Sequence, residues 1–527
     1  MKEVNGKGVL KVIILFFLLL VIISFFRYPD LRNEMKYFVV VSEMLEKKDM
    51  LILTYLGELY PDKPPMYFWI LAILKNIFNK SFYSVALIVA GVIPLIVTAK
   101  LVYSLFKEKL TVLIYISMVF VLGCSLVLRM DTLMTMFIVS SIVYFYKVYT
   151  DNNEKKESTL NKKHMLIVYF SMAAAILVKG GAGIVIPLLT IICFLYLNND
   201  FKFLKKIKFT QGILLVLGIV ILWLTAVFFE EKGKEYISLM LGKQTVGRVV
   251  NSSSHKRPIY FYLKNIFLTT MPFGIVFATG LFLYIKDFKN RFKWTQIEKL
   301  CISWIIPSIV FFSLVSGKLD IYLLPIYPGI AGLIWCFYNR KEWQKYFVKA
   351  SQITMVIFSI VSLVAGIFIF IKLKELYIFG IIFIALSLYL IYSLKMFLKY
   401  GNEKNLIVNI GVVMLFLMGG IALEANSYDN NYTLKPLEIM LDQGVKGEEI
   451  LLYRFDDSKN LLYFYDISYK SESEFSGIAE HIEKSENSNV KILSKTKRLK
   501  EITNQLKDYK YRILKENKEF VLIEVSK

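Results

Sequence analysis

Long apolar runs separated by short polar stretches are the dominant pattern along this chain. The first run, LKVIILFFLLLVIISFF at residues 10–26, contains a single charged residue. Runs of about 18 or more apolar residues with few charges are typical of membrane-spanning helices. The pattern therefore predicts a polytopic α-helical membrane protein with about 13 transmembrane helices, at residues 9–26, 82–106, 109–127, 131–149, 164–178, 181–197, 210–229, 264–285, 299–316, 320–338, 350–371, 376–398 and 405–424.

The polar stretches between these runs are of two kinds. Lysine and arginine gather in alternate short stretches, for example at Lys202, Lys205, Lys206 and Lys208, and this is typical of loops on the cytoplasmic side of a membrane. The N-terminus is then expected on the cytoplasmic side of the membrane. With an odd number of helices, the C-terminus is expected on the outer side. Since no small-residue cleavage site follows the first run, we expect that run to be retained.

Two long loops fall on the outer side of this topology, at residues 27–81 and 230–263. Within the first loop, residues 33–48 carry apolar side chains at helical spacing, which predicts a helix lying on the membrane surface. The same loop contains YPDKPPMYFW. Its prolines argue against a regular helix and predict a rigid turn that fixes Asp62 beside Lys63.

The last part of the chain is polar, which divides the molecule into a membrane region at 1–424 and a small extracytoplasmic α/β domain at 425–527. EEILLYRF and FVLIEVS are predicted to be strands, and SEFSGIAEHIEKS and RLKEITNQLKD to be amphipathic helices. No catalytic motif is visible in this domain. We expect it to support stability or access to the site.

Composition narrows the function classes. Of 527 residues, 56% are hydrophobic, which excludes an ordinary soluble globule, and the net charge is +22. That charge is spread over the inner loops rather than gathered in one patch, so it indicates topology and contact with anionic lipid, and a nucleic-acid partner is excluded. The cysteines form no CxxC pair and are expected to be small packing residues without a disulfide or metal role: Cys124, Cys193, Cys301 and Cys336.

Charged side chains that interrupt apolar sequence are the candidates for chemistry, because charge at membrane depth is costly. Most of them fall on the outer side: Glu34, Asp62, Lys63, Arg129, Asp131, Lys179, Arg248, His255, Lys318 and Asp320. Carboxylates can activate a hydroxyl or hold a divalent cation, and basic groups can neutralise a phosphate leaving group. Together they favour transfer from a phosphate-linked donor at the membrane surface.

Five segments, in this order along the chain, carry a family resemblance: NEMKYFVVVSEMLEKKDM with ELYPDKPPMYFW, LRMDTLMTMF, ILVKGGAGIVIP, VGRVVNSSSHKRPIYFYL with MPF, and FFSLVSGKLDIYLLPIYP. They resemble the lipid-linked-sugar glycosyltransferases of the GT-C fold, in particular the bacterial aminoarabinose transferases, which are relatives of the protein O-mannosyltransferases. The resemblance covers nearly the whole chain. Each segment alone is weak, but five in the right order are a strong signal.

The resemblance implies an integral-membrane inverting glycosyltransferase that moves a sugar from a polyprenyl-phosphate donor, without a nucleotide sugar. The acceptor would be an envelope component on the outer face: a lipid A-like glycolipid, a wall polymer or a protein. The implied donor-binding residues are Lys63, Arg248, Lys318, Tyr37 and Tyr322. The implied catalytic carboxylates are Asp131, Asp62 and Glu34, with Asp30, Asn33, Arg129, Lys179 and His255 as secondary candidates.

One departure from the family pattern bears on the mechanism. Asn33 stands where the family has its first aspartate, and Lys36 stands where it has an arginine. If the reaction needs a base, Asp30, Glu34 or Asp131 has to supply it, unless the acceptor is a phosphate that is already anionic. A divalent cation site is left equally open, with Asp131 and Glu34 as its candidate ligands.

Other interpretations remain at this point. The Asp62–Lys63 pair can be an interfacial ion pair worth under about 1 kcal/mol, Lys179 can extend along a helix end to the interface, and His255 can be a solvated loop residue. A transporter or flippase of a lipid-linked sugar would also have many helices and basic groups. The charges gather on one face, however, whereas alternating access needs a midplane site between repeats. A third possibility is an envelope scaffold whose outer domain binds a partner.

Overall fold

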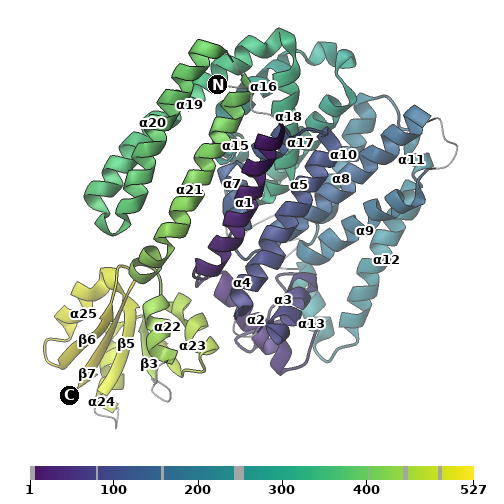
Figure 1. Cartoon of the computed structure of the whole chain (residues 1–527). Helices are drawn as coiled ribbons and strands as arrows, with labels where there is room; N and C mark the ends of the chain where they lie inside the picture. The colour runs from purple at the N-terminus through teal and green to yellow at the C-terminus, as the bar shows by residue number, and fades with distance from the viewer. Residues whose placement is uncertain are drawn as a thin grey trace.

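The computed structural model describes residues 6–78, 81–155, 160–242, 255–401, 403–442, 449–484 and 489–526. It is a helical bundle with a small sheet domain at one end, below the end of helix α21 (Figure 1). The helices of the bundle are α1 (Gly6–Phe26), α4 (Phe82–Leu87), α5 (Ile93–Phe106), α8 (Met130–Lys155), α9 (Lys162–Lys179), α10 (Ala182–Leu197), α11 (Phe203–Lys206), α12 (Phe209–Phe228), α17 (Gln296–Leu314), α18 (Tyr327–Asn339), α19 (Gln344–Lys372), α20 (Tyr377–Tyr400) and α21 (Glu403–Tyr432).

Nine helical segments among the described residues are long and apolar enough to cross a membrane, so the chain is a multi-pass membrane protein. The sequence predicts about 13, and each predicted run is helical, but four fall short of a single long apolar helix. The run at 109–127 is divided into α6 (Lys109–Ile116) and α7 (Val119–Ser125), and the run at 264–285 into α15 (Phe261–Thr269) and α16 (Gly274–Lys286). Helix α10 has only 16 residues, and α9 carries lysines at both ends.

The two divided runs are interrupted at the same place in space. The backbone N–H of Val119 donates to the carbonyl oxygen of Met271 at 2.8 Å. Each interruption therefore satisfies a polar backbone group of the other, which is what allows a helix to be broken inside an apolar bundle.

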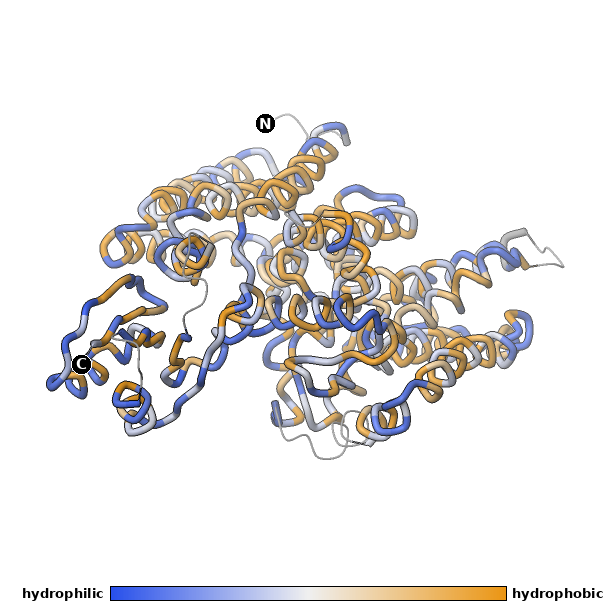
Figure 2. Tube along the Cα trace, turned by 90° about the horizontal axis from the view of Figure 1, so that it is seen from below, coloured by the Kyte–Doolittle hydropathy of each residue, from blue (hydrophilic) through white to orange (hydrophobic). Residues whose placement is uncertain are grey.

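The helices of the bundle are formed mostly by hydrophobic residues, and hydrophilic residues lie mainly at their ends and connections (Figure 2). Large side chains such as Leu222 on α12 and Leu398 on α20 are 73% and 70% exposed. Exposed apolar area on this scale is expected of a surface that faces lipid.

The first outer loop is folded rather than extended. It contains α2 (Glu34–Glu46), the short strands β1 (Thr54–Tyr55) and β2 (Glu58–Leu59), and α3 (Met66–Ile77). The predicted turn is confirmed, because α3 begins only at Met66, directly after the two prolines.

The predicted helix within residues 33–48 is also confirmed, as α2, but its expected position on a membrane surface is not what the structure has. Nearly every residue of α2 is buried. Helix α3 packs on one side, and on another Phe38 contacts Phe464 of the C-terminal domain at a ring distance of 6.2 Å. Protein therefore covers the apolar face that the sequence suggests for lipid.

The C-terminal region is an α/β unit built on a five-stranded sheet of order β4-β3-β5-β7-β6. The neighbours of β3 run parallel to it, while β7 is antiparallel to β5 and β6. The elements are α22 (Lys435–Asp442), β3 (Ile450–Tyr453), α23 (Lys459–Phe464), β4 (Tyr469–Glu472), α24 (Phe475–Lys484), β5 (Asn489–Lys495), α25 (Leu499–Gln505), β6 (Lys510–Glu516) and β7 (Phe520–Ser526). The two strands and two helices predicted here are confirmed as β3, β7, α24 and α25.

Alternate residues of the central strands point to opposite faces of this sheet. Leu451 and Ile523 pack with α24 and α25 in a core of their own, whereas Leu452 and Leu522 join the core that continues into the helical bundle. The predicted division at residue 424 falls inside α21, which continues to Tyr432.

Candidate functional site

The centre of the candidate site is a buried group of three charges: Asp131, Arg129 and Lys179, the Asp131 cluster. Asp131 is fully buried at the start of α8, and its Oδ2 lies 3.2 Å from Arg129 Nε. Lys179 Nζ binds the other carboxylate oxygen, Oδ1. Lys179 is the last residue of α9, which ends there because Gly180 takes a positive φ of 94°. Two basic groups on one buried carboxylate leave a net positive charge at this point.

Tyr322 brings a distant segment to the same place. It lies in the 3₁₀ helix η5 (Asp320–Ile326), and its ring centroid is 5.0 Å from Lys179 Nζ. A cation at this distance is attracted to the ring face. The lysine–glycine segment and the late tyrosine segment of the sequence therefore meet.

Tyr37 joins the first outer loop to the cluster. Burial raises the pKa of its phenol to about 12, and the charges of Arg129, Asp131 and Asp62 also act on it. These groups come from separate segments of the sequence, and they share one environment around the phenol oxygen.

Tyr67 is a residue of this environment that sequence reasoning missed. Its ring meets Tyr37 edge-on at 5.7 Å, and it is fully buried. Its hydroxyl has no hydrogen-bond partner among the described residues. The available signal was its place in YPDKPPMYFW, two residues after the prolines, where α3 begins.

Glu34 is buried and engaged through both carboxylate oxygens. Oε1 accepts from Arg27 Nη1 at 2.8 Å and from the backbone N–H of Leu128 at 2.5 Å. Oε2 accepts from the backbone N–H of Asp30 at 2.5 Å and from the Tyr83 hydroxyl at 3.4 Å. This geometry braces the first loop against the segment that leads into α8. A catalytic role for Glu34 stays a prediction, and the sequence did not single out Arg27 or Tyr83.

Asp30 and Asn33 lie at the exposed start of α2. The Oδ2 atom of Asp30 accepts from the Asn33 backbone N–H at 2.8 Å and from Asn33 Nδ2 at 3.2 Å. Asn33, which stands where the family has an aspartate, is thus part of a local turn closed by Asp30. Lys36, one turn of helix further on, lies 4.5 Å and 4.4 Å from the ring centroids of Tyr55 and Tyr60.

Asp62 and Lys63 are half-buried in the turn before α3. The turn is held from the second outer loop, because the hydroxyl of Tyr236 in α13 (Gly233–Leu239) donates to the Tyr60 carbonyl at 3.2 Å. The second outer loop therefore supports the turn two residues before Asp62.

Lys318 and His255 pair through their backbones. The Lys318 N–H donates to the His255 carbonyl at 3.0 Å, and the His255 side chain is exposed. The Lys318 ammonium donates to the carbonyls of Arg257 and Val315 at 3.1 Å and 2.5 Å, and burial lowers the pKa of Lys318. Two of the three N–H donors of this ammonium are used in the bridge. Arg248 lies outside the described residues.

The carboxylates suggested for a divalent cation, Asp131 and Glu34, both bind basic side chains. Within the described ranges, no three His, Cys, Asp or Glu side chains converge in the way a metal site requires. Metal dependence therefore gains no support from the geometry of these two residues.

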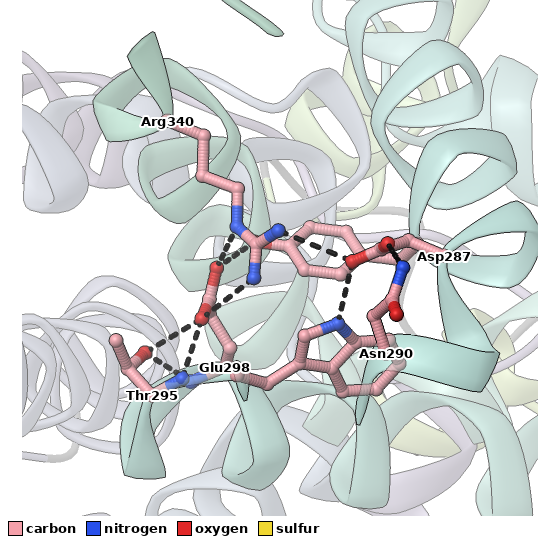
Figure 3. A network of polar contacts seen from close by, with 7 residues as sticks. Asp287, Asn290, Thr295, Glu298 and Arg340 are labelled. Atoms are coloured by element: carbon pink, nitrogen blue, oxygen red, sulfur yellow. Dashed lines mark hydrogen bonds and ion pairs between the residues drawn. The ribbon is translucent and has the colours of Figure 1, made fainter. Parts of the chain in front are cut away.

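A second charged group lies at the start of α17 (Figure 3). The sequence analysis did not single it out. In this Arg340 cluster, Arg340 Nε and Nη2 donate to the two oxygens of Glu298 at 2.6 Å and 3.2 Å, and Nη1 donates to Asp287 at 3.3 Å. Tyr284 and Thr295 add hydrogen bonds to Glu298. The group joins the ends of α16, α17 and α18.

Solved structures give the class of the fold. The crystal structure of ArnT from Cupriavidus metallidurans bound to undecaprenyl phosphate superposes with a TM-score of 0.74 at 14% identity, covering 99% of this chain and 98% of that one. The chain therefore has the same fold as this ArnT structure, a GT-C fold.

Part of the chain is similar in sequence to known membrane transferases. Residues 62–225 match the family model described as dolichyl-phosphate-mannose-protein mannosyltransferase, a range that includes Asp62, Lys63, Asp131 and Lys179. Undecaprenyl phosphate-alpha-4-amino-4-deoxy-L-arabinose arabinosyl transferases of Aeromonas hydrophila and Wigglesworthia glossinidia brevipalpis are 26% and 27% identical over 57% and 70% of this chain. The chain spans 54% and 65% of the lengths of these relatives. The chain is therefore similar to these arabinosyl transferases in sequence and to ArnT in fold.

Proposed function

We propose that this protein transfers a sugar from a polyprenyl-phosphate donor to an acceptor in the cell envelope, on the outer face of the cytoplasmic membrane. The observation that carries the proposal is the Asp131 cluster. Residues from separate outer segments converge there on a buried carboxylate whose two basic partners leave a positive field beside Tyr37 and Tyr322.

The chemistry is a displacement at the anomeric carbon of the sugar. The acceptor oxygen forms the new bond with inversion, while the bond to the polyprenyl phosphate breaks and the electron pair leaves with the phosphate. Lys63, with Arg248, would stabilise the phosphate charge as it develops, which is the usual contribution of fixed basic groups to phosphate leaving groups. Tyr37 and Tyr322 would line the donor site, and Asp131 would orient the basic groups and the acceptor.

Lys318 has a smaller part in this scheme. Its ammonium bonds to two backbone carbonyls, so we expect it to shape the loop at Arg257 rather than to bind the phosphate directly. Asn33 cannot act as a base. An acceptor that is already anionic, or a base such as Asp30 or Asp131, would meet that need.

The outer-face location and an inside N-terminus follow from the lysine-rich loops at alternate helix connections. The acceptor class is a glycolipid, a wall polymer or a protein. The relatives are named for transfer of an arabinose derivative from undecaprenyl phosphate. We propose a polyprenyl-phosphate-linked donor for this protein too, and assign no particular sugar.

The first experiment compares envelope fractions by mass spectrometry from wild type, a deletion strain, and the deletion strain complemented with Lys63→Ala or with Lys202→Ala as a control on an exposed loop. We expect the deletion and Lys63→Ala to lose the same sugar-sized mass from one acceptor class, and Lys202→Ala to keep it. Retention of that mass in Lys63→Ala at normal abundance would contradict the role of Lys63 and favour transport of the lipid-linked sugar instead.

A further inference from the structure

Asp320 is a charge on the predicted outer side that the sequence analysis singled out, and the proposed function leaves it without a role. We infer that Asp320, together with Asn265, binds hydroxyl groups of the sugar that the donor carries. The inference rests on the proposed function and deepens it, because it assigns a pair of residues to the sugar rather than to the phosphate. It also narrows the donor to sugars that bring no negative charge to these two residues.

The carboxylate of Asp320 has a neutral partner instead of a cation. Its Oδ1 and Oδ2 atoms accept from Asn265 Nδ2 at 3.1 Å and 3.4 Å. Within the part of the chain that the structure describes, Asp320 forms no ion pair and accepts from no other donor. A carboxylate can accept about four hydrogen bonds. Much of this capacity is therefore open to a ligand, at the start of a segment long and apolar enough to cross a membrane.

Other carboxylates on the predicted outer side differ in this respect. Both oxygens of Glu34 are hydrogen-bonded, and Asp131 is held by two basic side chains. The positive field of the Asp131 cluster attracts a phosphate, whereas the unpaired charge of Asp320 repels one. Asp320 therefore suits a neutral group that donates a hydrogen bond, and a sugar hydroxyl is such a group.

Asn265 supplies the second acceptor of the pair. Because Nδ2 is directed at the carboxylate of Asp320, the orientation of the amide is set, and its Oδ1 has no hydrogen-bond partner among the described residues. A carboxylate and an amide carbonyl side by side match two neighbouring hydroxyl donors of a sugar ring. Both residues are half-buried, so a ligand can reach them.

One helix holds both the carboxylate and the backbone beside it. The hydroxyl of Tyr262 donates to the carbonyl of Leu319, directly before Asp320, at 3.1 Å, and Tyr262 is 1% exposed. Tyr262 and Asn265 both belong to α15. The pair is thus in place before a ligand arrives, which limits the entropy lost on binding.

The pair lies beside the proposed donor site. Tyr322 follows Asp320 by two residues in η5, and its ring centroid is 5.0 Å from Lys179 Nζ. Burial raises the pKa of the Tyr262 phenol, and Tyr322 and Asp320 both add to the rise, so both are within electrostatic reach of one hydroxyl. Segment η5 also packs against α8, whose first turn carries Asp131. A sugar on a phosphate held at the Asp131 cluster would extend toward Asp320.

The test compares binding of the sugar with binding of the phosphate. Full-length protein in proteoliposomes receives the polyprenyl-phosphate sugar fraction purified from the deletion strain grown on ¹⁴C-labelled glucose, with envelope of the unlabelled deletion strain as acceptor. Free undecaprenyl phosphate is the competitive inhibitor, because it has the chain and the phosphate without the sugar. Rates are normalised to protein that elutes as a single folded species.

Two variants change the pair and a third is the control. Asp320→Asn removes the charge at nearly constant shape, and Asn265→Ala removes the amide. Asp508→Asn makes the same change at an exposed position of the C-terminal domain. We expect Asp320→Asn to raise the apparent KM for the donor about tenfold and Asn265→Ala about threefold, as loss of a charged and of a neutral hydrogen bond does. The inhibition constant of undecaprenyl phosphate should stay within about twofold in both, and the control should match wild type.

Three outcomes would overturn the inference while leaving the proposed function intact. They are an unchanged KM in both variants, an equal rise of KM and inhibition constant, and a fall in kcat at unchanged KM in Asp320→Asn. The second would mean that the pair acts on the phosphate or on the fold, and the third that Asp320 acts in the chemical step. If wild type transfers no labelled sugar, the proposed function itself fails, and this inference with it.

Discussion

The Asp131 cluster and the Arg340 cluster lie near opposite ends of α17 and differ in how completely their polar atoms are satisfied. Both carboxylate oxygens of Glu298 and all three guanidinium nitrogens of Arg340 bond within the Arg340 cluster. Around Asp131, by contrast, Tyr67 has a buried hydroxyl with no partner among the described residues.

The difference separates two uses of charge in an apolar chain. A buried network in which every polar atom is satisfied makes the local structure rigid and leaves nothing for a ligand. A network with an unsatisfied polar group beside it is less stable, but that group can form a hydrogen bond to a ligand. Among the described residues, the Tyr67 hydroxyl is therefore a polar group beside the Asp131 cluster that a ligand could satisfy.

The largest expected effect is on activity at the Asp131 cluster. Asp131→Asn keeps the shape of the side chain but removes the charge that orients Lys179 and Arg129, and we expect kcat/KM for transfer to fall about 100-fold or more. The measurement is sugar transfer by proteoliposomes, normalised to protein that elutes as a single folded species. Activity within threefold of wild type would remove Asp131 from the mechanism.

The matching change in the Arg340 cluster should affect stability instead. Glu298→Gln weakens the pairing of the partly buried Arg340 guanidinium, which keeps Asp287 as a partner, and should cost about 1–3 kcal/mol. We expect a clearly lower unfolding temperature in detergent, with transfer per folded molecule within about twofold of wild type. A loss of transfer without a loss of stability would mean that the Arg340 cluster also serves the reaction.

A pair of hydroxyl deletions sharpens the same contrast. Tyr284→Phe removes a 2.5 Å hydrogen bond to Glu298 and should cost about 1–3 kcal/mol. Tyr67→Phe removes no protein hydrogen bond among the described residues and should be neutral or slightly stabilising. We expect only Tyr67→Phe to change the KM for the donor, by several-fold, as read from initial rates. Equal loss of stability in both variants would show that Tyr67 is a packing residue with a satisfied hydroxyl.

The smallest expected effect concerns pH. Burial lowers the pKa of Lys318 from its ordinary value of 10.5, so the folded state binds fewer protons than the unfolded state between the lowered value and 10.5. Stability contributed by this site therefore rises with pH through that window and is lost below it. Lys318→Gln should flatten the rise. Thermal unfolding at several alkaline pH values measures it, and identical profiles for both proteins would contradict the burial argument.

Local signals predicted much of the fold. Apolar runs located the helices of the bundle, the prolines at Pro64 and Pro65 set the start of α3, and alternation along FVLIEVS gave β7. These features depend on residues close in sequence, which share one helix or one strand. The number of spans was less predictable, because backbone breaks such as the one at Val119 are satisfied only by another segment.

Contacts between distant segments could not be predicted. Asp131 and Lys179 were both candidates, yet their ion pair joins residues 48 positions apart. The brace at Glu34 needs Tyr83, and the burial of α2 needs Phe464 from the far end of the chain. In each case the partner is fixed by tertiary packing. The sequence around a side chain such as Tyr83 does not show whether it faces lipid or a carboxylate.

Helix α21 runs unbroken from Glu403 to Tyr432, and the turn between β6 and β7 is bonded to its last residues through Asn517 and Lys518. Lys518 also binds Glu375, just before α20. The C-terminal domain and this helix are thus one structural unit. A gene truncated after residue 424 would lose about two turns of α21 along with the domain, so its phenotype would report on both. A domain exchanged between relatives would have to carry α21 with it.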